Sequence, residues 1–122
     1  MLVSDHGMGT VDPNMVTDLT IVTNLEGTKI VPTGPNAGVF ITSNSARADA
    51  IRDALNNGLR YGRAYLRNEV PASLHYRNNP RVGNVVVLAN SGAVMDTGTR
   101  PPVGMHGILL ASEPDILKGQ HI

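Results

Sequence analysis

Apolar positions recur at helical spacing in one clear segment of the chain, SARADAIRDALNNG. They share one face of the expected helix: Ala48, Ile51, Ala54 and Leu55. The side chains of Ser43, Asn44 or Ser45 can cap this helix by accepting hydrogen bonds from the free N–H groups of its first turn. Asn57 and Gly58 form a stop signal at its other end. The pattern therefore predicts an amphipathic helix near the middle of the chain.

Short apolar runs typical of β-strands lie on both sides of this helix. Lys29 to Val31 and Gly38 to Thr42 are separated by the turn residues PTGPNAG, which indicates a β-hairpin. Residues 61–67 alternate Tyr and Arg with Gly, Ala and Leu, and NVVVLA leads into an Asn-Ser-Gly turn signal. The stretch MVTDLTIV fits a short helical turn and the start of a strand equally well.

Two further strands are expected at the ends of the chain. Leu2 and Val3 form the stub of a buried strand, and Ile108 to Ala111 form a short closing strand. The order is then a strand, a hairpin, a helix and three strands. This order favours a mixed α/β (α+β) fold.

Composition excludes several classes of function. The formal net charge is zero and aromatic residues make up 3%, so nothing steers the chain toward nucleic acid and no base-stacking surface is expected. No apolar run approaches the ~20 residues that span a bilayer. The first residues also lack the parts of a signal peptide, and the compartment stays unknown. Because cysteine is absent, any metal has to be bound by histidine and carboxylate side chains.

Asp5 and His6 are the first candidates for such a site. Neighbouring residues on a strand point to opposite faces, so both can bind one ion only where the strand ends and the backbone turns. Gly7 allows that turn, and a carboxylate with an imidazole suits Zn²⁺. The alternative is an ordinary strand-end turn in which Asp5 acts as a local cap.

The chain has three other histidines. His106 lies in GMHG before an apolar run, where it is either a ligand beside the end of a sheet or an exposed loop residue. His75, in LHYRNN, is expected to pack or to form hydrogen bonds, and His121 to be solvated. Sequence patterns for a serine-nucleophile elbow, a phosphate-binding loop or a dinucleotide-binding turn do not occur. The residues alone indicate an α/β domain, with part of a metal site as one interpretation.

Three segments in a fixed order resemble the nucleotide pyrophosphatase/phosphodiesterase branch of the alkaline-phosphatase superfamily. SDHGM resembles the second metal-ligand motif of that branch. YLRNEVPASLHYRNNPRVGNVVVLANSGAVM resembles its segment with a His-Tyr pair and a following apolar strand. MHGILLASEPDILKGQHI resembles its closing strand. The resemblance covers nearly the whole chain.

This resemblance implies the carboxy-terminal part of an alkaline-phosphatase-like α/β sandwich, with a small helix-plus-antiparallel-strand subdomain. It implies three parts: a metal-motif strand and loop at 1–27, the subdomain at 28–96, and a closing loop and strand at 97–122. The family binds two zinc ions. Asp5 and His6 would bind the zinc that activates a threonine nucleophile, and His106 would bind the other zinc or match a later Met-His pair. The nucleophile is expected upstream, so no catalytic residue is assigned within this chain.

The function that the resemblance implies is hydrolysis of phosphodiester or pyrophosphate bonds by a zinc-dependent enzyme. The substrate would be a small phosphodiester or a nucleotide, not a nucleic acid. The chain alone is expected to be inactive. The alternative is a non-catalytic, stand-alone domain that forms homo-oligomers or binds a partner, because the strand in MLV would leave an apolar edge that a second copy could cover.

Overall fold

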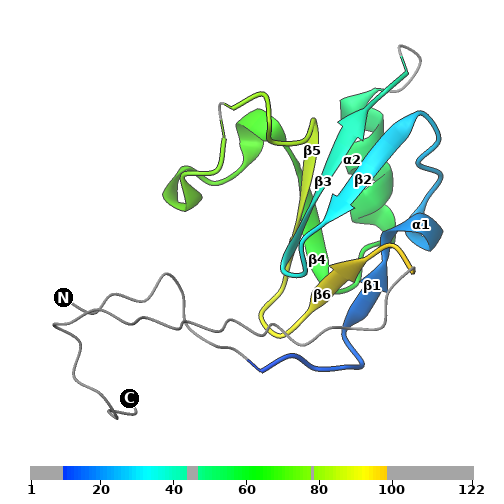
Figure 1. Ribbon diagram of the computed structural model, residues 1–122, viewed down its shortest axis with the longest axis vertical. Coiled ribbons are helices and arrows are strands. Elements are labelled where there is room, and N and C mark those ends of the chain that lie inside the picture. Colours follow the sequence, from blue (N-terminus) through cyan, green and yellow to red (C-terminus); the bar gives the residue numbers. More distant parts are fainter. Residues whose placement is uncertain (1–9, 44–46, 78, 99–122) are drawn as a thin grey trace, which may run out of the picture.

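The computed structural model describes residues 10–43, 47–77 and 79–98, and a four-stranded antiparallel sheet forms the centre of these residues (Figure 1). The strand order is β2-β3-β5-β4. The strands are β2 (Thr28–Pro32), β3 (Asn36–Ile41), β4 (Gly62–Leu66) and β5 (Val85–Ala89). The expected hairpin is confirmed, since Thr28 pairs with Ile41 and Pro32 with Ala37. The β-branched run beginning at Val85 became β5, which lies between β3 and β4.

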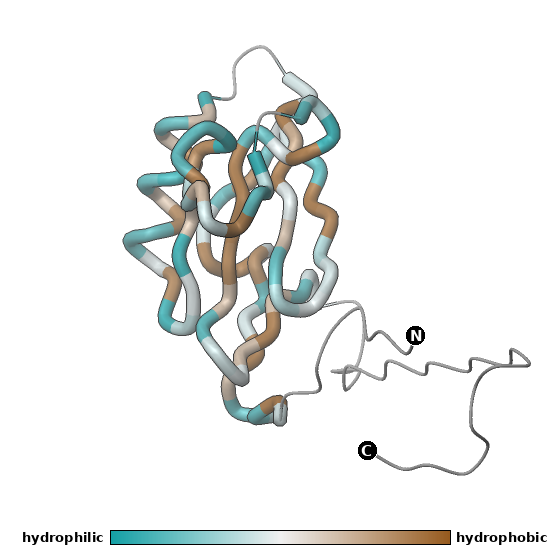
Figure 2. Tube along the Cα trace, turned by 90° about the vertical axis from the view of Figure 1, so that its left-hand side faces the viewer, coloured by the Kyte–Doolittle hydropathy of each residue, from teal (hydrophilic) through white to brown (hydrophobic). Residues whose placement is uncertain are grey.

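Helix α2 (Ala48–Gly58) covers one face of this sheet. Ile51 and Leu55 of the predicted apolar face are buried and belong to the same cluster as Val39, Val85 and Val87 of the sheet. Each such side chain contributes about 1.5–3 kcal/mol when it is withdrawn from water. In Figure 2 the apolar stretches run through the middle of the described body and the polar ones lie mostly at its periphery. The helix predicted from periodicity is therefore confirmed, including its end at Gly58.

The N-cap position of this helix differs from the prediction. The residue at the N-cap position is Arg47, whose side chain makes no capping hydrogen bond, whereas Ser43 lies before the helix. Asn44 and Ser45 are outside the described residues. Asp49, in the first turn, places a negative charge near the positive end of the helix, which is a favourable position for it.

The other face of the sheet is covered in part by the connection between β4 and β5. This connection contains two short 3₁₀ turns, η1 (Arg67–Glu69) and η2 (Ala72–Leu74). Val70 and Val82 fold back from it onto Val86 to form a second, smaller cluster. The strand predicted over residues 61–67 ends at Leu66 because the backbone turns into η1 there.

MVTDLTIV contains both structures that its pattern allows. It forms β1 (Val16–Asp18) and then α1 (Leu19–Val22). Asp18 ends the strand and caps the helix, because its Oδ1 accepts hydrogen bonds from Thr20 N at 2.9 Å and Thr20 Oγ1 at 2.6 Å. Strand β1 pairs in parallel with β6 (Val94–Asp96).

The terminal strands predicted at residues 2–3 and 108–111 lie outside the described residues. The three-part division of the chain stays a prediction. In the part of the chain that the structure describes, no helix is long and apolar enough to cross a membrane.

Candidate functional site

Asp5, His6 and His106, the predicted metal ligands, lie outside the described residues. The structure does describe the segment into which the Asp-His motif leads. Asp12 N donates to Gly92 O at 2.9 Å, and Val94 N donates to Met15 O at 3.0 Å. The chain that follows the motif is therefore fixed along the turn between β5 and β6.

Both partners in this contact have a defined local conformation. Gly92 has a φ of 80°, which favours glycine, and a Cβ placed on it would be 3.4 Å from Thr10 O. Asp12 forms an Asx turn, since its Oδ1 accepts from Asn14 N at 2.8 Å and Asn14 Nδ2 at 3.1 Å. The first described residues are thus held by backbone and side-chain hydrogen bonds together.

A pair of carboxylates marks the carboxyl ends of β1 and β6. Asp18 and Asp96 are paired in the parallel register. The Asp18 carboxylate accepts hydrogen bonds from Thr20, and Asp96 Oδ1 accepts one from Thr97 N at 2.7 Å. Gly98, with a φ of 71°, packs so closely on Asp18 that a Cβ there would overlap its carboxylate. No local sequence pattern indicates this pair, because its members come from distant segments.

These two carboxylates do not make a metal centre by themselves. Among residues 10–43, 47–77 and 79–98, no three His, Cys, Asp or Glu side chains come together in a way that could hold an ion. The described residues therefore supply no complete set of ligands, and the predicted ligand pair belongs to the segment before them.

His75 differs from the expectation. Its side chain is exposed and makes no hydrogen bond with the described residues, so the expected packing role is wrong. Its backbone has a φ of 50° and ends η2, with its N–H donating to Ala72 O at 3.0 Å. His75 therefore ends the 3₁₀ turn η2 with a left-handed backbone conformation, which is uncommon for a residue other than glycine.

Comparison with known families gives a match over most of the chain. The sequence model of the family "Type I phosphodiesterase / nucleotide pyrophosphatase" matches residues 1–109. Comparison with curated protein sequences gives no match.

Solved structures of a nucleotide pyrophosphatase/phosphodiesterase also resemble this chain. The murine ectonucleotide pyrophosphatase/phosphodiesterase 5 is 26% identical, with a TM-score of 0.69 over 80% of this chain and 26% of that chain. An inactive variant of the murine protein in complex with AMP is 25% identical, with a TM-score of 0.68 over 80% of this chain and 25% of that chain. The human protein, at 21% identity, has a TM-score of 0.64 over 75% of this chain and 24% of that chain, which shows the fold alone.

The chain thus spans about a quarter of the length of these structures. Its mixed α/β arrangement, with two sheets, matches their alkaline-phosphatase-like fold. On the match over residues 1–109, the chain belongs to the type I phosphodiesterase/nucleotide pyrophosphatase family.

Proposed function

We propose that this chain is part of a metal-dependent phosphodiesterase or nucleotide pyrophosphatase. The observation that carries the proposal is the family match over residues 1–109, which includes the SDHGM motif at Ser4 to Met8. The structures matched at 25–26% identity support the same class of hydrolase.

The proposed metal is zinc, with Asp5 and His6 as ligands. A carboxylate oxygen and an imidazole nitrogen are donors that zinc takes in proteins. Zinc, when bound, would stabilise negative charge on the attacking and leaving oxygens of the phosphoryl group. His106 is proposed as a ligand of a second zinc.

The described residues have a positioning role in this proposal. Only a few residues separate His6 from Thr10, where the described backbone begins. From there the hydrogen bond between Asp12 and Gly92 ties the chain to the β5–β6 turn. We therefore assign the Asp12–Gly92 contact the task of holding the segment that carries the ligands.

The proposed substrate is a nucleotide or another small phosphodiester. AMP is present in the structure of the inactive murine variant, which supports a nucleotide. The neutral net charge and low aromatic content give no support for a long nucleic acid. Because the chain spans about a quarter of these relatives, we propose that it does not turn over substrate by itself.

Zinc titration of the 122-residue chain by calorimetry tests the ligand assignment. Asp5→Ala and His6→Ala should each weaken binding at least about tenfold, since each removes one metal–ligand bond. His75→Ala is the matched control, because His75 is exposed and is not a proposed ligand. Unchanged zinc affinity in Asp5→Ala and His6→Ala would refute the assignment. Robust hydrolysis of a nitrophenyl phosphodiester by the purified chain would refute the proposed inactivity.

A further inference from the structure

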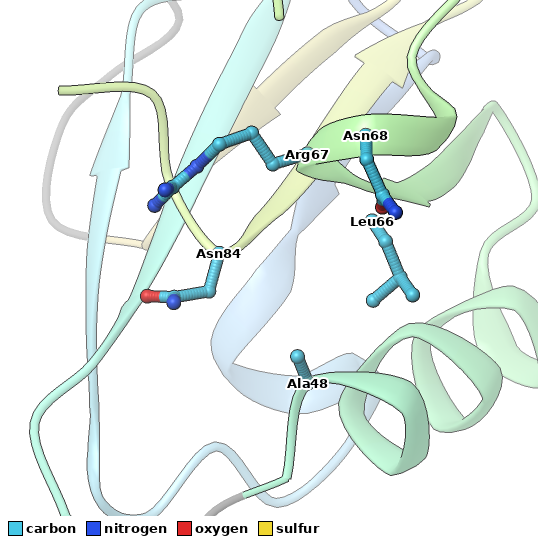
Figure 3. Close-up of a pocket in the computed structure, with 5 residues that line it drawn as sticks. All are labelled: Ala48, Leu66, Arg67, Asn68 and Asn84. Atoms are coloured by element: carbon cyan, nitrogen blue, oxygen red, sulfur yellow. The ribbon is translucent and has the colours of Figure 1, made fainter. Parts of the chain in front are cut away.

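A hollow of about 310 Å³ lies where the start of α2, the end of β4 and η1 meet (Figure 3). Its lining residues are Ala48, Leu66, Arg67, Asn68 and Asn84. Gly62, at the opposite end of β4, packs against Met95 of β6. Strand β4 has five residues and spans about 13 Å, so the hollow is separate from the ends of β1 and β6.

Arg67 is held in place on one side of the hollow. Its Nε–H donates to Gly83 O at 3.2 Å, and its backbone N–H donates to Asn84 O at 3.1 Å. The residue is half-buried. Among the described residues, no carboxylate or carbonyl accepts from its two terminal nitrogens. Within the described residues, the guanidinium therefore has several hydrogen-bond donors that no acceptor uses.

Asn84 adds a second fixed donor. Its Oδ1 accepts from Ile41 N at 2.9 Å, which sets the orientation of the carboxamide. The Nδ2 group then remains, and it has no partner in the described part of the chain. Figure 3 shows the Asn84 carboxamide and the Arg67 guanidinium on the same side of the hollow.

The nearby carboxylates form ion pairs with arginines other than Arg67. Glu69 accepts from Arg52 Nη1 at 2.8 and 2.9 Å and from Leu66 N at 3.2 Å, and Asp49 pairs with Arg47 at 2.7 Å. Neither carboxylate lines the hollow. The lining thus combines a cation and amide donors with the apolar side chains of Ala48 and Leu66.

We infer that this hollow binds an oxyanion, a carboxylate or phosphate group, between Arg67 and Asn84. A planar guanidinium donates two parallel hydrogen bonds to two oxygens of such a group. The inference does not depend on the proposed phosphodiesterase activity, because it rests on residues outside the proposed metal site.

Nuclear magnetic resonance of the ¹⁵N-labelled 122-residue chain tests the inference. Sodium phosphate, sodium acetate and sodium chloride are titrated separately at matched ionic strength. Saturable shifts of the Arg67 Nε–H and Asn84 Nδ2 signals with phosphate or acetate, and none with chloride, are expected. A response to phosphate only, or to acetate only, identifies the preferred group. Equal shifts with chloride, or no saturable shift with either oxyanion, overturn the inference.

Two variants and one control sharpen the test. Asn84→Asp keeps the oxygen that accepts from Ile41 N, and so the local fold, but places a carboxylate beside Arg67. Arg67→Gln removes the charge. Each should weaken binding by at least about tenfold, the effect of losing a charge-assisted hydrogen bond. Arg63→Gln is the control, because Arg63 lies in β4, the strand that leads into Arg67, is exposed and does not line the hollow. If Asn84→Asp, correctly folded, binds the oxyanion as the natural chain does, the site is not between these two side chains.

Discussion

Asn56 of α2 pairs with both backbone groups of Ala64 in β4. Its Oδ1 accepts from Ala64 N at 2.8 Å, and its Nδ2 donates to Ala64 O at 2.9 Å. Strand β4 is at the edge of the sheet, so these groups would otherwise have no strand partner. The carboxamide therefore acts as a short substitute for a neighbouring strand, which protects the edge from pairing with another chain.

Asn56→Ala should destabilise the chain by about 1–2 kcal/mol more than Asn57→Ala does. The reason is that it removes the hydrogen bonds of both backbone groups of Ala64, which is buried. Asn57 is the matched control, since it is exposed, lies in the last turn of the same helix, and its side chain makes no hydrogen bond within the described residues. Urea unfolding followed by circular dichroism measures the difference. Equal destabilisation of the two variants would contradict the role of Asn56.

Gly83→Ala should destabilise the fold by about 1–3 kcal/mol through overpacking. A Cβ on Gly83 would lie 2.7 Å from Val39 N, 2.9 Å from Val39 O and 2.9 Å from Val85 O, all of them backbone atoms of the sheet. Gly38→Ala is the control, because its nearest contact, at 3.0 Å, is the edge of the Phe40 ring, which can move. Thermal unfolding of both variants should give the larger loss for Gly83→Ala. The same loss in both would show that the close approach to the backbone does not matter.

Chelation of divalent metal ions should leave the melting temperature of the chain unchanged. The core is formed by apolar clusters and sheet hydrogen bonds, and the described residues hold no group of three metal-binding side chains. Melting curves with and without EDTA test this expectation. A marked fall in melting temperature with EDTA, reversed by zinc, would show that a metal supports the fold as well as the proposed chemistry.

Local patterns predicted the parts of this fold whose stabilising contacts are close in sequence. The spacing of Ile51 and Leu55 was sufficient for α2, and the turn residues between Val31 and Gly38 were sufficient for the hairpin. The parallel pairing of β1 with β6 was not predictable, because it joins distant segments and no local pattern encodes it. The first residue of α2 was not predictable to the residue, because Arg47, which is not a typical capping residue, occupies the N-cap position.

The candidate sites also differ in whether their residues are close in sequence or are brought together by the fold. The Asp5-His6 motif is contiguous in sequence and was found there, although its role stays a prediction. The hollow around Arg67 and Asn84 forms only when the end of β4 meets the residue before β5. Asn56 and Asn57 are adjacent residues of the same type, so the sequence alone does not distinguish them. Their positions around the helix differ, and only Asn56 faces β4.

The interaction of Arg52 with Glu69 should make part of the stability depend on pH. The hydrogen bond from Arg52, followed by that from Leu66 N, lowers the pKa of Glu69 below its ordinary value. A carboxyl group whose pKa is lowered in the folded state stabilises the fold above its ordinary pKa, and this contribution is lost as the pH falls through the lowered pKa.

Arg52→Gln should therefore raise the pKa of Glu69 toward its ordinary value. The stability difference between the natural chain and Arg52→Gln should be full at neutral pH and shrink on acidification. Carbon-13 resonances of the Glu69 carboxyl give the midpoint, and urea unfolding across the pH range gives the stability. Arg60→Gln is the control, because Arg60 contacts the ring of Tyr61 and makes no ion pair with Glu69. An unchanged Glu69 midpoint in Arg52→Gln would assign the lowered pKa to the Leu66 N–H alone.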